Sequence, residues 1–162
     1  GCDIGGIDCV VVPPGVFKKI VKSSYDPRAL DVFRTNLRLI KAATEVLGMR
    51  LFVGKQATLL VAGLPERYRM ASAYERHGFD HEAHVDAFQR IYQVIDEEIP
   101  RPQVFDATPL SGNPENFYDH VHPTPLGAAR TAAIVAAALA PAVSAIEAAD
   151  TSIGSPPTPT SH

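Results

Sequence analysis

An aspartate and a histidine three residues apart, Asp119 and His122, are the residues of this sequence best suited to acid–base chemistry. A carboxylate beside an imidazole can orient the ring and stabilise its protonated form, which a general base needs when it activates a hydroxyl nucleophile. The spacing therefore predicts a catalytic pair in which His122 is the base and Asp119 orients it. The simpler alternative is that Asp119 caps a turn and His122 is an ordinary surface residue.

The residues that follow this pair have the pattern of a helix start. The hydroxyl of Thr124 can accept a hydrogen bond from a free backbone N–H, and Pro125 suits the first helical position because it lacks an N–H. An Ala-rich helix is predicted from Pro125 to about Ala140, ending at Pro141. The pair should therefore lie on a short turn at a helix N-terminus.

Apolar runs that alternate with helical patterns predict an α/β domain over residues 1–149. Buried strands are expected at 7–12, 49–54 and 103–106, and helices at 26–47 and 80–98. A helix followed by Gly48 and a buried strand is typical of a β-α-β unit with parallel strands. The composition of residues 150–162, rich in Ser, Thr, Pro and Gly, predicts a disordered tail.

The segment 55–79 leaves the carboxyl end of a predicted strand. In open parallel sheets, ligands bind outside these strand ends. The segment is therefore expected to form a wall of the substrate pocket, with an ordinary surface excursion as the alternative. Within it, residues 59–61 fit either a short strand or an apolar loop.

Composition and charge limit which classes of partner the protein is expected to bind. The chain has 162 residues, of which 46% are hydrophobic and 20% charged, as in one soluble globular domain. The net charge of −3 gives no reason to expect binding to nucleic acid or to an acidic membrane surface. No apolar run is expected to reach the length of a membrane span. Cys2 and Cys9 form no metal-binding pattern, although they could form one disulfide.

Two groups of residues could in principle bind a metal ion. His81 and His84 could share one helix face, and Asp119, His120 and His122 could serve a hydrolytic metal centre. No further residue near His81 completes a set of ligands. We therefore expect neither a metal nor an organic cofactor.

The block Tyr118–Pro123, together with Gly127, resembles the last sequence block of the SGNH (GDSL-type) serine hydrolases. In that family, an Asp and a His at this spacing are two members of the catalytic triad. The resemblance extends over a region similar to the C-terminal two-thirds of an SGNH domain. It implies a flavodoxin-like three-layer α/β/α sandwich with a parallel sheet, and hydrolysis of acyl esters such as lipids or acylated sugars.

The sequence departs from this family in two places. It contains no Gly-Asp-Ser block, in which the family carries its nucleophile. The family's oxyanion Gly and Asn correspond to Gly15 and Phe17, so Gly15 fits while the side-chain donor is missing. We expect an ester hydrolase whose Ser and first two strands precede Gly1. The alternative is a complete chain that has become a non-catalytic SGNH-like binding or structural module.

Overall fold

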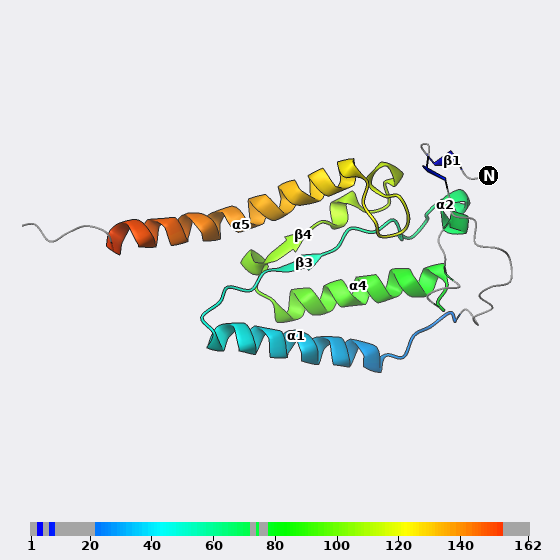
Figure 1. Ribbon diagram of the computed structural model, residues 1–162. Helices are drawn as coiled ribbons and strands as arrows, with labels where there is room; N and C mark the ends of the chain where they lie inside the picture. The colour runs from blue at the N-terminus through cyan, green and yellow to red at the C-terminus, as the bar shows by residue number, and fades with distance from the viewer. Residues whose placement is uncertain (1–2, 5–6, 9–21, 72–73, 75–77, 154–162) are drawn as a thin grey trace, which may run out of the picture.

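The structure is a computed structural model that describes residues 3–4, 7–8, 22–71, 74 and 78–153 (Figure 1). Its helices are α1 (Arg28–Val46), α2 (Glu66–Ala71), α4 (His81–Glu98) and α5 (Pro125–Ile153). Its strands are β1 (Asp3–Ile4), β2 (Ile7–Asp8), β3 (Val53–Lys55) and β4 (Val104–Asp106). Short 3-10 turns, η1 (Arg101–Gln103), η2 (Thr108–Leu110) and η3 (Pro114–Asn116), flank β4 and precede α5.

Strands β3 and β4 form a parallel pair in which Val53 lies opposite Val104 and Lys55 opposite Asp106. Helix α4 connects them, so the expected α/β character and the parallel pairing are confirmed for these strands. Strand β3 is shorter than the predicted strand at 49–54 and ends one residue later. The reason is that the prolines in Pro100-Arg101-Pro102 begin the η1 turn, so β4 extends no further back to pair with residues 50–52.

Helices cover both sides of this strand pair. Helices α1 and α4 lie side by side on one side, and α5 lies on the other and extends beyond the strands (Figure 1). One apolar cluster joins α1, α4 and the strands, and its buried members are Leu37 of α1, Val94 and Ile95 of α4, and Ile99 just after α4. A second cluster packs against Ile134 of α5, and its buried members are Ala57, Leu59, Leu64, Ala107 and Phe117.

The N-terminal segment differs from the prediction. Strand β2 pairs with β1 in the antiparallel sense, with Ile4 opposite Ile7, instead of joining a parallel sheet. The dipeptide Gly5-Gly6 between the two strands is a sequence that favours a two-residue hairpin connection, which only antiparallel strands can use. The rest of the predicted strand, residues 9–12, lies outside the described residues.

Helix α5 also differs from the prediction, because it continues through Pro141 to Ile153. Proline removes one intrahelical hydrogen bond, here the one to the carbonyl of Ala137. The segment 142–149 that follows is rich in Ala, the residue with the highest helix propensity, and it sustains the helix. The tail expected from residue 150 is therefore helical over its first four residues, and residues 154–162 lie outside the described part of the chain.

The expectation that no apolar run reaches the length of a membrane span is wrong for one stretch of α5. The 24 residues Pro125–Ala148 are long and apolar enough to cross a membrane, judged by length and composition alone. A single helix of this kind does not establish a membrane-spanning pattern. Part of this helix packs on protein, since Ile134 contacts the second apolar cluster.

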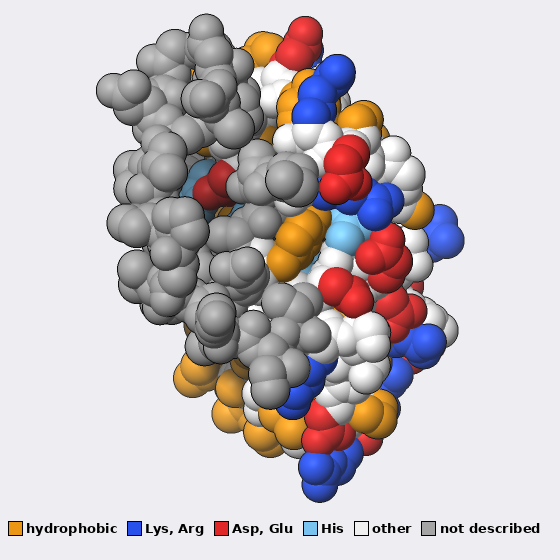
Figure 2. Space-filling view, turned by 90° about the vertical axis from the view of Figure 1, so that its right-hand side faces the viewer, with side chains coloured by type: hydrophobic (Ala, Val, Ile, Leu, Met, Phe, Trp, Pro, Cys, Tyr) orange, Lys and Arg blue, Asp and Glu red, His pale blue; other side chains and the backbone are white. Residues whose placement is uncertain are grey.

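The molecular surface carries charges of both signs. On the face shown in Figure 2, acidic and basic side chains of the described residues lie interspersed. Ion pairs such as Arg69–Glu82 and Arg90–Asp86 are examples of this mixing on the protein. Interspersed charges of opposite sign cancel at a distance, so this described surface produces little long-range field.

Candidate active site

Asp119 and His122 lie together as their spacing predicts. The carboxylate Oδ2 of Asp119 is 2.6 Å from Nδ1 of His122. Its Oδ1 accepts hydrogen bonds from the backbone N–H groups of His122, at 2.7 Å, and Val121, at 2.8 Å. Asp119 therefore caps the turn and orients the imidazole at the same time.

The hydrogen bond to Asp119 fixes the tautomer of the neutral His122 ring. An ionised carboxylate can only accept, so Nδ1 carries the proton and Nε2 presents its lone pair. The His122 side chain is 75% exposed. Among the described residues, Asp119 is the one hydrogen-bond partner of this imidazole. The ring is thus placed to take a proton at Nε2 from a group that approaches from solvent.

The environment of Asp119 keeps its carboxyl group ionised. Partial burial, the largest single influence, raises the pKa of Asp119. The backbone N–H groups of His122 and Val121 and the His122 side chain all donate to the carboxylate. Together with the electrostatic effect of His120 they outweigh burial. The pKa of Asp119 consequently lies below its ordinary value of 3.8.

We expect Asp119→Asn to lower the free energy of unfolding by about 1 kcal/mol at pH 7, because a charged acceptor of several hydrogen bonds is lost. The expected loss of stability is small because the Asp119 side chain is 39% exposed, so solvent weakens the electrostatic interactions of its carboxylate. A carboxyl group whose pKa is lower in the folded chain stabilises the fold above its unfolded pKa. That stability is lost as the pH falls through the folded pKa.

The difference between wild type and Asp119→Asn should therefore shrink below about pH 4. Urea unfolding at pH 7, 5 and 3 measures it. Glu45→Gln, which changes an exposed carboxylate near the C-terminal end of α1, is the matched control and should show little change at any of these pH values. A destabilisation by Asp119→Asn that persists undiminished at pH 3 would contradict the prediction.

The segment after β3 holds the turn from one side. The carbonyl of His120 accepts hydrogen bonds from the Thr58 hydroxyl, at 2.8 Å, and from the Leu59 backbone N–H, at 2.9 Å. Thr58 and Leu59 are both buried. Residues 59–61 therefore form a buried loop and no strand, and the turn sits at the carboxyl end of β3.

Helix α5 holds the turn from the other side. The Thr124 hydroxyl accepts a hydrogen bond from the Gly127 N–H at 3.1 Å and donates one to the Glu115 carbonyl at 2.7 Å. The predicted helix cap is thus confirmed. A Cβ atom on Gly127 would lie 2.1 Å from the carbonyl oxygen of Asn116, so only glycine allows the helix to approach η3 this closely.

Asn116 is a positioning residue that the sequence did not reveal. Its side chain is only 2% exposed, and its Nδ2 donates to the Leu110 carbonyl at 2.8 Å. Its Oδ1 accepts from the guanidinium of Arg130 at 2.6 Å. Asn116 in η3 and Arg130 in α5 are 14 positions apart, so no sequence periodicity predicts that they pair. The sequence hint of a buried role for Asn116 was its position next to the apolar Phe117.

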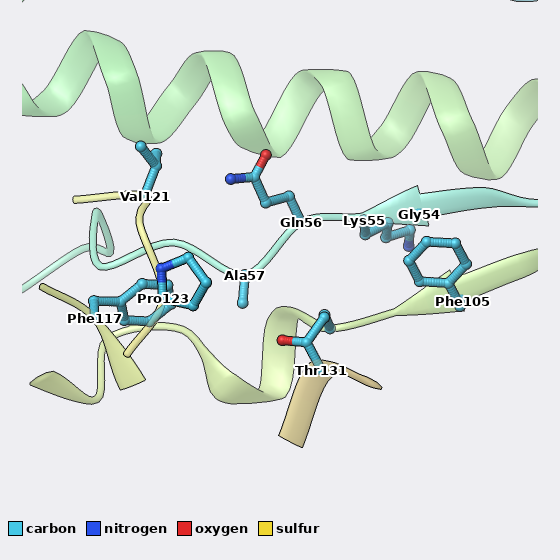
Figure 3. A pocket seen from close by; sticks show the side chains of 10 residues that line it. Gly54, Lys55, Gln56, Ala57, Phe105, Phe117, Val121, Pro123 and Thr131 are labelled. Carbon is cyan, nitrogen blue, oxygen red and sulfur yellow. The ribbon is translucent and has the colours of Figure 1, made fainter. Parts of the chain in front are cut away.

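An apolar cavity of about 280 Å³ lies beside the turn (Figure 3). Val121 and Pro123, which flank His122 in the sequence, line it. Gln56 and Ala57, which follow β3, line it as well. Part of the segment 55–79 therefore does border a cavity next to the pair.

The structure gives His81 and His84 structural roles. His81 is buried, with Nε2 2.9 Å from the Val61 carbonyl and Nδ1 2.8 Å from the Tyr74 hydroxyl. His84 Nδ1 lies 2.8 Å from the Asp80 carbonyl. Within the part of the chain that the structure describes, no group of three or more His, Cys, Asp or Glu side chains is placed to hold a metal ion.

The remaining site expectations concern the oxyanion donor and the nucleophile. Gly15 and Phe17 lie outside the described residues, as do both cysteines. Ser111 accepts a hydrogen bond from the Thr58 backbone N–H at 3.1 Å. Among the described residues, no serine hydroxyl is hydrogen-bonded to His122.

Comparison with known proteins finds no matching family model, no matching curated protein and no matching solved structure. The Asp119–His122 pair, the turn that carries it and the cavity beside it are therefore the features from which a function is inferred.

Proposed function

We propose that this chain carries the acid–base machinery of a serine ester hydrolase of the SGNH type, with His122 as general base and Asp119 as its orienting residue. The observation that supports this most directly is the 2.6 Å contact between Asp119 Oδ2 and His122 Nδ1, on a ring that is 75% exposed. This contact supports the assignment of Asp119 and His122 as two members of a catalytic triad. The sequence resemblance gives the same assignment.

In the proposed reaction, His122 Nε2 takes the hydroxyl proton of a serine as its Oγ attacks the ester carbonyl carbon. The imidazolium returns this proton to the leaving alcohol. Water, deprotonated by His122, then hydrolyses the acyl-enzyme and frees the acid. Asp119 stays ionised throughout and stabilises the imidazolium, a role that its lowered pKa supports.

The proposal places the nucleophilic Ser upstream of Gly1 and makes the backbone N–H of Gly15 an oxyanion donor. It also assigns the whole domain a flavodoxin-like three-layer α/β/α sandwich. The parallel β3–β4 pair and the helices on both of its sides support this assignment. The apolar cavity beside Val121 and Pro123 suits the acyl part of a lipid or acylated-sugar ester.

A fluorophosphonate probe tests the proposal on the natural gene product. The probe forms a bond between an activated serine Oγ and phosphorus and releases fluoride. Peptide mapping is expected to find one labelled Ser upstream of Gly1. The label should be lost in His122→Ala and kept in the neighbouring control His120→Ala.

One observation favours a second candidate, a non-catalytic SGNH-like binding or structural module. Phe17 stands where the family has its oxyanion Asn, and a Phe side chain has no hydrogen-bond donor. Absence of any labelled Ser, or labelling that does not depend on His122, would overturn the hydrolase proposal and favour this module.

A further inference from the structure

A second cavity, of about 610 Å³, lies at the amino ends of the parallel strands. Its lining comes from residues that precede or begin β3 and β4 and from the middle of α5: Arg50, Phe52, Arg101, Pro102, Gln103, Val104, Ala137, Ala138, Pro141 and Ala142. The Asp119–His122 turn sits at the opposite, carboxyl end of β3. This groove is therefore separate from the candidate active site.

Two arginines on this groove have no carboxylate partner among the described residues. Neither Arg50 nor Arg101 forms an ion pair with an acidic side chain that the structure describes, and no acidic side chain lines the groove. Arg50 makes one long contact, from Nη1 to the Ala142 carbonyl at 3.3 Å.

By contrast, six other described arginines pair with acids, namely Arg28, Arg34, Arg38, Arg69, Arg90 and Arg130, and Arg67 lies over the ring of Tyr68. The open groove thus combines two cationic groups that have unused donors with an otherwise uncharged lining.

The walls of the groove are apolar and leave room for a chain. Phe52 and Val104 form the strand side, and Ala137, Ala138 and Pro141 form the helix side. The volume falls within the range of about 300–1,000 Å³ that is usual for small-molecule sites. A guanidinium group matches a carboxylate with two parallel hydrogen bonds, and an apolar wall favours an alkyl chain.

We propose that this groove binds a single-chain anionic amphiphile, namely a free fatty carboxylate. Its head group pairs with Arg50 and Arg101, and its alkyl chain lies along Phe52 and the alanines of α5. The charge complementarity of the two arginines selects a carboxylate over a neutral chain. This site goes beyond the proposed hydrolase activity and does not depend on it.

Isothermal titration of the full chain with monomeric decanoate tests the proposal, with decanol as the neutral ligand of equal chain length. We expect saturable binding of one decanoate per chain, at least about tenfold tighter than that of decanol. Arg50→Gln and Arg101→Gln should each weaken decanoate binding by about tenfold and leave decanol binding unchanged. Ala138→Leu, which fills the groove, should weaken the binding of both ligands.

Arg28→Gln is the matched control, because Arg28 lies at the far end of α1 and pairs with Asp26. It should bind decanoate like the wild type. Circular dichroism and the urea midpoint establish that each variant is folded. Equal binding of decanoate and decanol, no effect of either arginine substitution in a folded variant, or binding to anionic vesicles without binding to monomeric decanoate would each overturn the proposal.

Discussion

Replacing His122 by alanine in the natural gene product is expected to lower kcat/KM for an acyl ester by about 10⁴-fold or more, because the general base is lost. Asp119→Asn should also reduce the rate strongly. The amide can donate a hydrogen bond to Nδ1, which shifts the ring proton to Nε2 and removes the basic lone pair from the side that faces solvent. KM should change little in either variant, since neither side chain is assigned to ground-state binding.

Hydrolysis of p-nitrophenyl acetate and of a longer acyl ester measures this effect, with His120→Ala as the control. The backbone carbonyl of His120, which holds the turn, is unchanged by the substitution, and its side chain is only the last of several influences that lower the pKa of Asp119. The control should therefore retain most of its activity. Retention of more than about a tenth of wild-type activity by folded His122→Ala would show that His122 is not the base.

The second large effect concerns stability. We expect Gly127→Ala to lower the free energy of unfolding by about 1–3 kcal/mol, the usual result of overpacking. The new Cβ would lie 2.1 Å from the carbonyl oxygen of Asn116, and backbone atoms yield little. Relief requires the first turn of α5 to move away from η3. That movement strains the Thr124 N–H to Asn116 carbonyl hydrogen bond, which is 2.9 Å long.

The sign of this effect makes the prediction specific. At an exposed helix position, Gly→Ala should stabilise a protein by about 1 kcal/mol through helix propensity alone. Ala132→Gly, at an exposed position on the same helix, is the matched control and should cost about that amount. Urea unfolding followed by circular dichroism measures both variants. A gain in stability from Gly127→Ala would show that α5 does not approach η3 as closely as the structure indicates.

Local patterns predicted the parts of this protein that depend on neighbouring residues. Thr124 and Pro125 mark the start of α5, and Asp80 marks the start of α4, where its side chain accepts from the Ala83 N–H at 2.8 Å. A helix cap involves only three or four adjacent residues, so its sequence is sufficient evidence. The same holds for Asp119 and His122, whose short spacing places a carboxylate within reach of the ring.

Predictions were wrong where two local features of the sequence favoured different structures. Pro141 was expected to end α5, but the Ala-rich segment after it continues the helix to Ile153. Ile7 and Asp8 begin the segment 7–12 that was predicted as a buried parallel strand, yet they pair with the adjacent strand β1 in the antiparallel sense. The propensity of a short segment indicates which conformations it favours. The neighbouring segments with which it can pair then determine which conformation it adopts.

The sequence alone was enough to predict that Asp119 contacts His122, that a helix follows them and that a β-α-β order surrounds them, because these features depend on spacing and capping along the chain. The contacts that hold the turn in place became visible only in the folded chain. Thr58 binds the His120 carbonyl across 62 residues, and Arg130 binds Asn116 across 14. Such contacts form between segments that share no sequence periodicity. They result from the packing of the segment after β3, η3 and α5 against one another, which no pattern within a single segment predicts.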